Sequence, residues 1–189
     1  MKKAILHTCC GPCAGGVLKA FKEKFDEILL FFSNSNLNSR EEYNKRLFEV
    51  KKLAKKEGIK LIEDDYNHSD WLRYIKKLNR ENQPSQIETE AEGGERCRRC
   101  FEYRLARTAE LAKKKGFSFS TTLTVSPYKN ELVLNEEAKE VEAEGSLFIP
   151  LDKIGNKKEI WKESFKISRE LDMYRQKYCG CEFSIKNTD

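Results

Sequence analysis

Short apolar runs alternate with longer amphipathic stretches along the whole chain. The apolar runs have the length and composition of strands, and they lie at residues 4–8, 27–32, 59–63, 117–125 and 147–151. The stretches between them have apolar residues at helical spacing, at about 14–25, 40–57, 71–78, 97–115 and 157–175, with a further helix rich in Glu and Ala after residue 130. The run EILLFF is uninterrupted, which is typical of a strand covered on both faces.

This alternation predicts an α/β protein with an open, mostly parallel five-stranded sheet, helices on both faces and right-handed crossovers. Such a three-layer, Rossmann-like sheet collects its ligands outside the carboxyl ends of its strands. Residues 79–96 are polar, acidic and glycine-bearing, and they predict a long loop or lid that becomes ordered on binding. With no internal repeat or linker in the pattern, we expect a single domain over residues 1–189.

Composition places this domain in the cytoplasm. Charged residues make up 35% of the chain, and no stretch approaches the roughly 18 apolar residues of a membrane span, so we expect no membrane partner. The apolar part of MKKAILHTCC is too short for a signal peptide. Seven cysteines without an export signal predict reduced thiols that serve metals or catalysis. The net charge of +5 would assist docking to a polyanion, but a solvated Lys/Glu surface explains most of it.

The seven cysteines fall into three groups, and none is isolated. Cys9, Cys10 and Cys13 follow the first strand, Cys97 and Cys100 open a helix, and Cys179 and Cys181 lie near the C-terminus. A helix N-terminus favours thiolates, and the carboxyl edge of the sheet would also receive Asp64-Asp65-Tyr66 and the loop SPYKN. Seven thiolates and a carboxylate are enough to ligate an iron–sulfur cluster and a second metal.

Three other hypotheses explain less of the chain. A structural four-cysteine zinc site would leave three thiols without a role. Cys10-Gly11-Pro12-Cys13 also spells the active site of thioredoxins, but Cys9 replaces their tryptophan and five parallel units are the wrong topology. An ATP-using PP-loop enzyme could share the Rossmann-like (HUP-like) architecture, yet its SGGxDS signature is here CCGPCAGG, with only Gly15-Gly16 in support. The main alternative is therefore a zinc-stabilised RNA-binding module without catalytic activity.

Taken in order, the motifs resemble the QueH-type epoxyqueuosine reductases, the cobalamin-independent enzymes of tRNA queuosine biosynthesis. The resemblance rests on LHTCCGPC (6–13), NLNSREEY (36–43), EDDYN (63–67), GERCRRCFEYRLARTA (94–109), TTLTVSPYKN (121–130) and YRQKYCGCEFS (174–184). Ser35 and Ser39 stand where the family pattern has prolines, and Asn67 stands where it has an aspartate. This last departure leaves Asp65 as the better candidate carboxylate, with Asp64 as the alternative.

The resemblance implies a metal-binding catalytic domain that reduces epoxyqueuosine to queuosine at the tRNA wobble position, with loss of water. It implies a [4Fe–4S] cluster, an adjacent mononuclear metal (iron or zinc), an external electron donor, and the anticodon loop of tRNA as partner. Our hypothesis shares the metal ligands among Cys9, Cys10, Cys13, Cys97, Cys100, Cys179, Cys181 and Asp65, without dividing them between the two sites. Candidate catalytic residues are Asp65 and Tyr66, and candidate substrate-binding residues are Arg96, Arg99, Lys129 and Tyr174.

Overall fold

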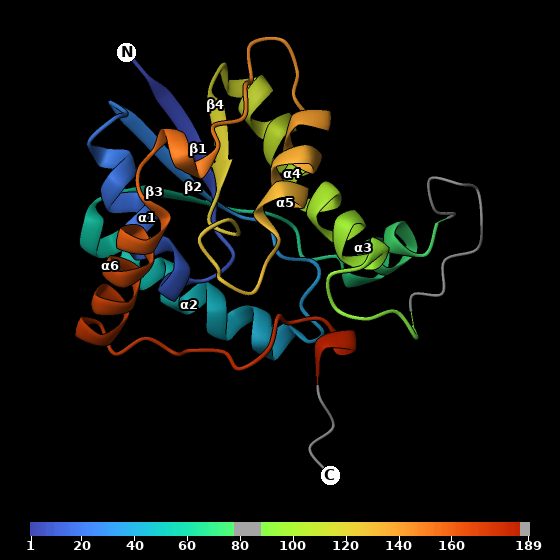
Figure 1. Ribbon diagram of the computed structural model, residues 1–189. Coiled ribbons are helices and arrows are strands. Elements are labelled where there is room, and N and C mark those ends of the chain that lie inside the picture. The colour runs from blue at the N-terminus through green and yellow to red at the C-terminus, as the bar shows by residue number, and fades with distance from the viewer. Residues whose placement is uncertain (78–87, 186–189) are drawn as a thin grey trace.

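The computed structural model describes residues 1–77 and 88–185 and confirms the α/β class (Figure 1). Its strands are β1 (Lys3–His7), β2 (Glu27–Phe32), β3 (Lys60–Glu63) and β4 (Ser118–Thr121). Its helices are α1 (Gly11–Lys22), α2 (Arg40–Glu57), α3 (His68–Ile75), α4 (Glu95–Lys115), α5 (Glu131–Glu140) and α6 (Lys157–Glu170), with short 3₁₀ helices at Leu151–Lys153 and Glu182–Ser184. Residues 79–87 of the predicted loop or lid lie outside the described residues, as does residue 78 at the end of the helix predicted at 71–78; residues 88–94 form turns and α4 begins at Glu95.

The strand order is β3-β2-β1-β4, and all the pairings are parallel. The chain runs outward from β1 through β2 to β3, and then returns to place β4 on the other side of β1. The order therefore reverses at the carboxyl ends of β1 and β4, which is where ligands bind in open α/β sheets. The loop with Cys9 follows β1 and the loop with Thr122 follows β4, so both lie at this switch point.

The prediction of five strands is wrong, because the described residues form a sheet of four. The run at 147–151 makes a single parallel bridge, between Phe148 and Phe119, with backbone hydrogen bonds of 3.0 and 2.8 Å on either side. Pro150 follows at once and has no N–H for a further ladder bond, and the chain then enters a 3₁₀ turn. β4 also ends earlier than predicted, since the Thr124 hydroxyl donates to the carbonyl of Thr121 and closes a turn.

Alternating side chains divide the core between the two faces of the sheet. Ala4 and Leu6 of β1 pack with apolar residues of α1, α2 and α6, whereas Ile5 packs with those of α4 and α5. In Figure 1 the two sets of helices lie on opposite sides of the strands. The prediction of helices on both faces is therefore confirmed.

Gly15-Gly16 lies inside α1, where it allows α6 to approach closely. A Cβ on Gly16 would lie 2.2 Å from the carbonyl oxygen of Ile160, and the Gly16 N–H donates to the Ser164 hydroxyl at 3.0 Å. A Cβ on Gly15 would similarly meet Ile167 at 2.9 Å. Helix packing thus accounts for the two glycines that a pyrophosphate-binding loop would otherwise explain.

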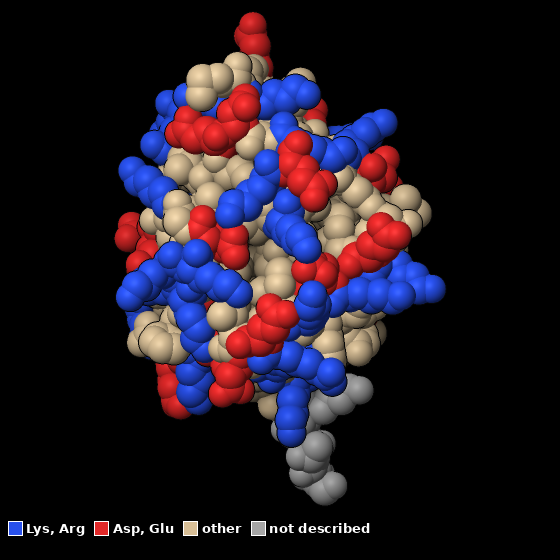
Figure 2. Space-filling model, turned by 90° about the vertical axis from the view of Figure 1, so that its left-hand side faces the viewer, with Lys and Arg blue, Asp and Glu red and all other residues tan. Residues whose placement is uncertain are grey.

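The outer face of α1, α2 and α6 carries both signs of charge. Figure 2 shows lysine, arginine and acidic side chains interspersed over it. Lys19 pairs with Glu163 at 2.8 Å and Lys22 with Glu57 at 2.6 Å. Such a mixed surface is typical of a solvated face without a strong field of one sign. Within 1–77 and 88–185, no helix has both the length and the apolar composition needed to cross a membrane.

Candidate metal centre

Cys9, Cys10 and Cys13 form one group at the end of β1. Their sulfur atoms all lie within 4.8 Å of one another, and the Cys9 and Cys10 sulfurs are 3.7 Å apart. Cys10 has an extended backbone and caps α1, and Pro12 fits the first turn because its ring fixes a helical φ. The strand end thus holds Cys9 and Cys10, and the first helical turn brings Cys13 back beside them.

Hydrogen bonds among the three thiols of this group shift their pKa values in opposite directions. Hydrogen bonds from Cys10 and then Cys13 lower the pKa of Cys9 below its ordinary value. The hydrogen bond from Cys13 lowers the pKa of Cys10. The hydrogen bond to Cys9 and burial outweigh this effect and raise the pKa of Cys10 to about 12. The hydrogen bonds to Cys10 and Cys9 also raise the pKa of Cys13. Repulsion between thiolates opposes further ionisation, and a bound cation would remove that repulsion.

Cys97, Cys100, Cys179 and Cys181 form a second group, which lines one cavity. The first turn of α4 places Cys97 and Cys100 three residues apart on one helix face. The Gly93 N–H donates to the Cys97 sulfur at 3.2 Å. Burial raises the pKa of Cys97 and Cys181, and raises that of Cys100 to about 12.

Arg46 of α2 holds the C-terminal cysteines in place. Its guanidinium pairs with Glu42 at 2.7 Å and donates to the carbonyls of Cys179 at 2.8 Å and Tyr178 at 3.4 Å. Gly180 has a φ of 128° and lies against Leu37, where a Cβ would come within 2.4 Å of that side chain. Only glycine allows the chain to turn there, so the Cys-Gly-Cys spacing directs both cysteines to the cavity.

Lys129 lines the same cavity and faces both cysteine groups. Burial would lower the pKa of its ammonium group, but the negative charge of Cys179, and then of Cys9 and Cys13, outweighs burial and raises it. Lys129 therefore stays protonated, as a cation that lines the cavity.

A buried donor beside the cavity fits a sulfur-rich metal group. Trp71 is fully buried against Cys100 and Cys181, and its Nε1–H has no hydrogen-bond acceptor among the described residues. Asn36 also lines the cavity; its buried Oδ1 has no donor among the described residues, and because an amide oxygen only accepts, cluster sulfur would not satisfy it. An indole N–H can only donate, and the sulfur of a bound cluster would accept from it. Four cysteines suit a [4Fe–4S] cluster or a zinc ion, and three suit a single metal with an open position.

Further hydrogen bonds support the three-cysteine group from outside. The Gln176 amide donates to the Cys10 sulfur at 3.1 Å, and the Thr122 hydroxyl donates to the Cys9 sulfur at 3.3 Å. Four residues of the site were not among those predicted from the sequence: Gln176, Thr122, Trp71 and Asn36. All of them except Trp71 lie in motifs that carry the resemblance, which is the signal that could have identified them.

The loop after β3 gives the adjacent residues Asp64 and Asp65 different surroundings. Arg107 of α4 and the Ser33 hydroxyl both donate to the Asp64 carboxylate. Asp65 is exposed, and it lines a second hollow with Tyr66 and Arg40. The Tyr66 hydroxyl donates to the carbonyl of Leu37 at 2.7 Å. The structure thus places Asp65 outside the residues that line the cysteine cavity, and the catalytic roles of Asp65 and Tyr66 stay predictions.

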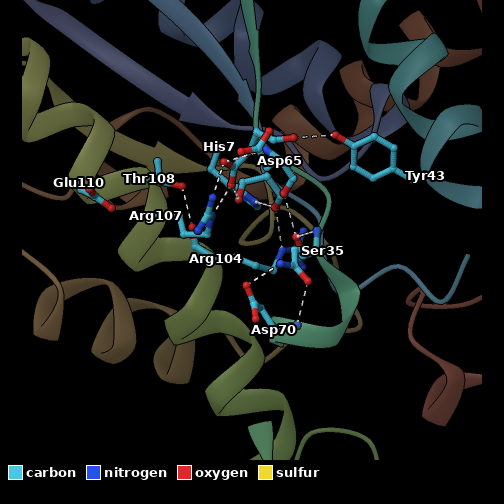
Figure 3. A network of polar contacts seen from close by, with 12 residues as sticks. His7, Ser35, Tyr43, Asp65, Asp70, Arg104, Arg107, Thr108 and Glu110 are labelled. Atoms are coloured by element: carbon cyan, nitrogen blue, oxygen red, sulfur yellow. Dashed lines mark hydrogen bonds and ion pairs between the residues drawn. The ribbon is translucent and has the colours of Figure 1, made fainter. Parts of the chain in front are cut away.

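A buried network beneath the site includes His7 (Figure 3). Its Nε2 lies 3.1 Å from the carbonyl of Ser33, which can only accept, so Nε2 carries the proton. Its Nδ1 lies 2.8 Å from the Thr121 hydroxyl. Burial, assisted by the charge of Arg104, lowers the pKa of His7 to about 3. Arg104 in turn donates to Asn34. His7 is therefore a neutral, packed strand residue.

The other predicted substrate-binding residues make contacts within the chain. Arg96 is 2% exposed, donates to the Glu90 carbonyl at 2.8 Å and lies over the Phe183 ring. Arg99 donates to the carbonyls of Ile75 and Lys77. The Tyr174 hydroxyl donates to Glu42 at 3.0 Å. Among the predicted substrate contacts, Lys129 and Arg96 line the cysteine cavity, whereas Arg99 and Tyr174 are outside its lining.

Known proteins resemble this chain over nearly its whole length. The model of the family described as "Epoxyqueuosine reductase QueH" matches residues 4–187. A relative of that name from Streptococcus pyogenes is 33% identical over 190 residues, which cover 96% of this chain and 70% of the relative. Those from Haemophilus influenzae (32% over 188 residues, 99% and 73% covered) and Thermotoga maritima (33% over 190 residues, 98% and 91% covered) have the same name. The chain therefore belongs to the epoxyqueuosine reductase QueH family.

Proposed function

We propose that this oxidoreductase reduces the epoxide of epoxyqueuosine at the wobble position of tRNA to the cyclopentene of queuosine. The observation that carries the proposal is the arrangement of the seven cysteines: three have sulfurs within 4.8 Å of one another, and the other four line one cavity. We assign a [4Fe–4S] cluster to the four-cysteine group, which comprises Cys97, Cys100, Cys179 and Cys181. We assign a single metal, iron or zinc, to the three-cysteine group, which comprises Cys9, Cys10 and Cys13.

The reaction takes up two electrons and two protons, and the epoxide oxygen leaves as water. When bound, the cluster supplies electrons singly and the metal supplies a Lewis acid for oxygen. Lys129 lines the cavity and holds a proton on Nζ, from which it can donate a hydrogen bond to the epoxide oxygen. Trp71, Phe101 and Val133 give the cavity apolar walls, which exclude water and strengthen the charge of Lys129.

The partners follow from this chemistry. The anticodon loop of tRNA brings the modified base to the cavity, and an external donor supplies the electrons. Reduced thiols and a tRNA substrate place the reaction in the cytoplasm. Asp65 and Tyr66 remain the predicted catalytic residues of the neighbouring hollow, and Arg96, Arg99 and Tyr174 remain predicted substrate contacts.

The assignment is tested by matched cysteine variants of the full chain, purified without oxygen. We expect Cys97→Ala to lose the brown colour and the acid-labile sulfide, and Cys13→Ala to keep both while losing the single metal. If both variants lose the same metal and the sulfide together, the division into two sites is wrong. The activity is tested by converting epoxyqueuosine-containing tRNA with a strong chemical reductant. A fully loaded protein that leaves the epoxide intact would contradict the proposed substrate.

A zinc-stabilised RNA-binding module is the second candidate, because four cysteines can ligate one zinc ion. Among the described residues, however, the sulfurs that lie within 4.8 Å of one another are those of Cys9, Cys10 and Cys13. The zinc module leaves the grouping of Cys9, Cys10 and Cys13 without an explanation. A colourless protein with one zinc and no sulfide would establish it. A thioredoxin-like dithiol is less well supported, since the pKa values of Cys10 and Cys13 are both raised, whereas an attacking thiol requires a lowered one.

A further inference from the structure

Tyr128 lines the mouth of the four-cysteine cavity, yet its side chain is 86% exposed. It is the most exposed aromatic residue in the part of the chain that the structure describes. Burying a large apolar side chain stabilises a fold, and a ring held in solvent makes little such contribution. Packing within the chain therefore does not explain an aromatic side chain at this position.

The backbone that carries this ring is ordered. The Tyr128 N–H donates to the Ser126 hydroxyl at 3.3 Å, and the Lys129 N–H donates to the Ser126 carbonyl at 3.4 Å. Asn130 then caps α5, its side chain accepting from the N–H groups of Leu132 and Val133 at 3.0 and 3.4 Å. A fixed turn presents the ring to solvent at the cavity mouth, so a partner would lose little entropy in ordering it.

The ring also lies beside a cation that faces inward. Tyr128 and Lys129 are consecutive and both line the cavity. Lys129 is partly buried there, whereas most of the Tyr128 side chain is exposed to solvent. An exposed aromatic face at the entrance to a reaction cavity fits the flat face of a nucleobase, because proteins bind unpaired bases by stacking them on aromatic rings.

We propose that Tyr128 stacks on a nucleobase of the anticodon loop and thereby positions the modified base in the cavity. The inference rests on the proposed function, and it assigns substrate recognition to a residue outside both cysteine groups. The contact is made in the bound complex before the reaction as well as during it. It therefore acts on the binding of tRNA much more than on the rate of the bound complex.

The test compares Tyr128→Leu with Tyr128→Phe and Tyr128→Trp in the metal-loaded enzyme. Leucine keeps apolar area and removes the ring, so we expect the Kd for an anticodon stem-loop and the KM for tRNA to rise on the order of 10-fold, with kcat little changed. Phenylalanine and tryptophan retain wild-type values. In the tryptophan variant, the stem-loop should quench additional fluorescence above that of Trp71 and Trp161. The control is Phe48→Leu, which changes an exposed aromatic of α2 outside the cavity lining and should have no effect.

The outcomes separate this inference from the proposed function. If wild type converts tRNA and Tyr128→Leu binds it equally well, the stacking contact is wrong and the function stands. If Tyr128→Leu is impaired only with a protein electron donor and not with a chemical reductant, the residue docks the donor and the inference is overturned. If wild type with full metal content neither binds nor converts the tRNA, the proposed function fails and removes the basis of the contact. Unchanged metal content and Tm in the variants show that the fold is intact.

Discussion

Replacing Arg46 should detach the C-terminal cysteines from the cavity. Arg46 is 3% exposed and lies between the Glu42 carboxylate and the carbonyls of Tyr178 and Cys179. In Arg46→Met the Glu42 carboxylate keeps only the hydroxyl of Tyr174 as a partner in this cluster. The variant therefore leaves a buried charge without its counter-ion and removes the donors that hold the segment bearing Cys179 and Cys181.

The magnitude follows from burial. Removing one partner of a buried ion pair costs about 3–5 kcal/mol, whereas a domain is stable by about 5–15 kcal/mol. For a chain of this length each kcal/mol lowers Tm by about 2–4 °C, so we expect Tm to fall by about 6–20 °C. The double variant Glu42→Leu/Arg46→Met removes both charges and should recover much of this stability. The carbonyls of Tyr178 and Cys179 still lack their donors, so the double variant should remain poor in iron and sulfide.

The assay measures thermal unfolding and, in parallel, iron and acid-labile sulfide after anaerobic reconstitution. The control is Lys45→Ala in the same helix, which breaks an exposed pair with Glu41 at 2.7 Å and should cost no more than about 1 kcal/mol. If Arg46→Met binds as much iron as the control and unfolds at the same temperature, the docking role of Arg46 is refuted. A double variant with full stability and full iron content would show that the ion pair, but not the carbonyl contacts, matters.

Three further variants test other parts of the structure. Gly16→Ala should lower stability by about 1–3 kcal/mol in urea unfolding because its Cβ has no space against α6, while Lys19→Ala on the exposed side of α1 should change little; equal values would contradict the close packing. Gln176→Leu should weaken metal binding by the three-cysteine group about 10-fold in a chelator competition, since it removes a donor to the Cys10 sulfur, and unchanged affinity would assign the amide no such role. Asp64→Asn should lose about 1–3 kcal/mol of stability because it weakens the contact with Arg107. Asp65→Asn should leave stability unchanged, so any loss of activity in it would be catalytic. The opposite order of stabilities would reverse the roles assigned to the two carboxylates.

The fold class could be predicted because each element has a local signature. EILLFF is typical of a strand covered on both faces, and it forms β2. Ser39 caps α2 by accepting from the Glu42 N–H, the arrangement of a capping box. The run at 147–151 has the same kind of apolar signature but forms only a bridge. A strand exists only if a neighbour completes its ladder, and Pro150 ends that ladder after one contact. The apolar composition of a segment does not show whether a neighbouring strand will pair with it.

The candidate site shows the same limit at the level of side chains. The cysteine motifs indicated a metal site, because three groups of thiols have few other uses in a reduced compartment. Asp65 and Asp64 are adjacent in sequence, but only their surroundings distinguish them: Arg107, more than forty residues away, neutralises Asp64 and leaves Asp65 exposed. Gln176 is polar in a polar segment, and only its distance of 3.1 Å to the Cys10 sulfur gives it a role.

By itself, the sequence determined the class of the fold, the family resemblance and the candidate sulfur ligands, since periodicity and residue chemistry are local properties. The tertiary structure decided that the described residues form a sheet of four strands, that the sulfurs of Cys9, Cys10 and Cys13 lie within 4.8 Å of one another, and that the other four cysteines line one cavity. That arrangement depends on the reversal of strand order beside β1 and on the tail that Arg46 holds against α2. Both bring together residues far apart in the chain, and the free energy of such contacts exists only when the whole chain has folded.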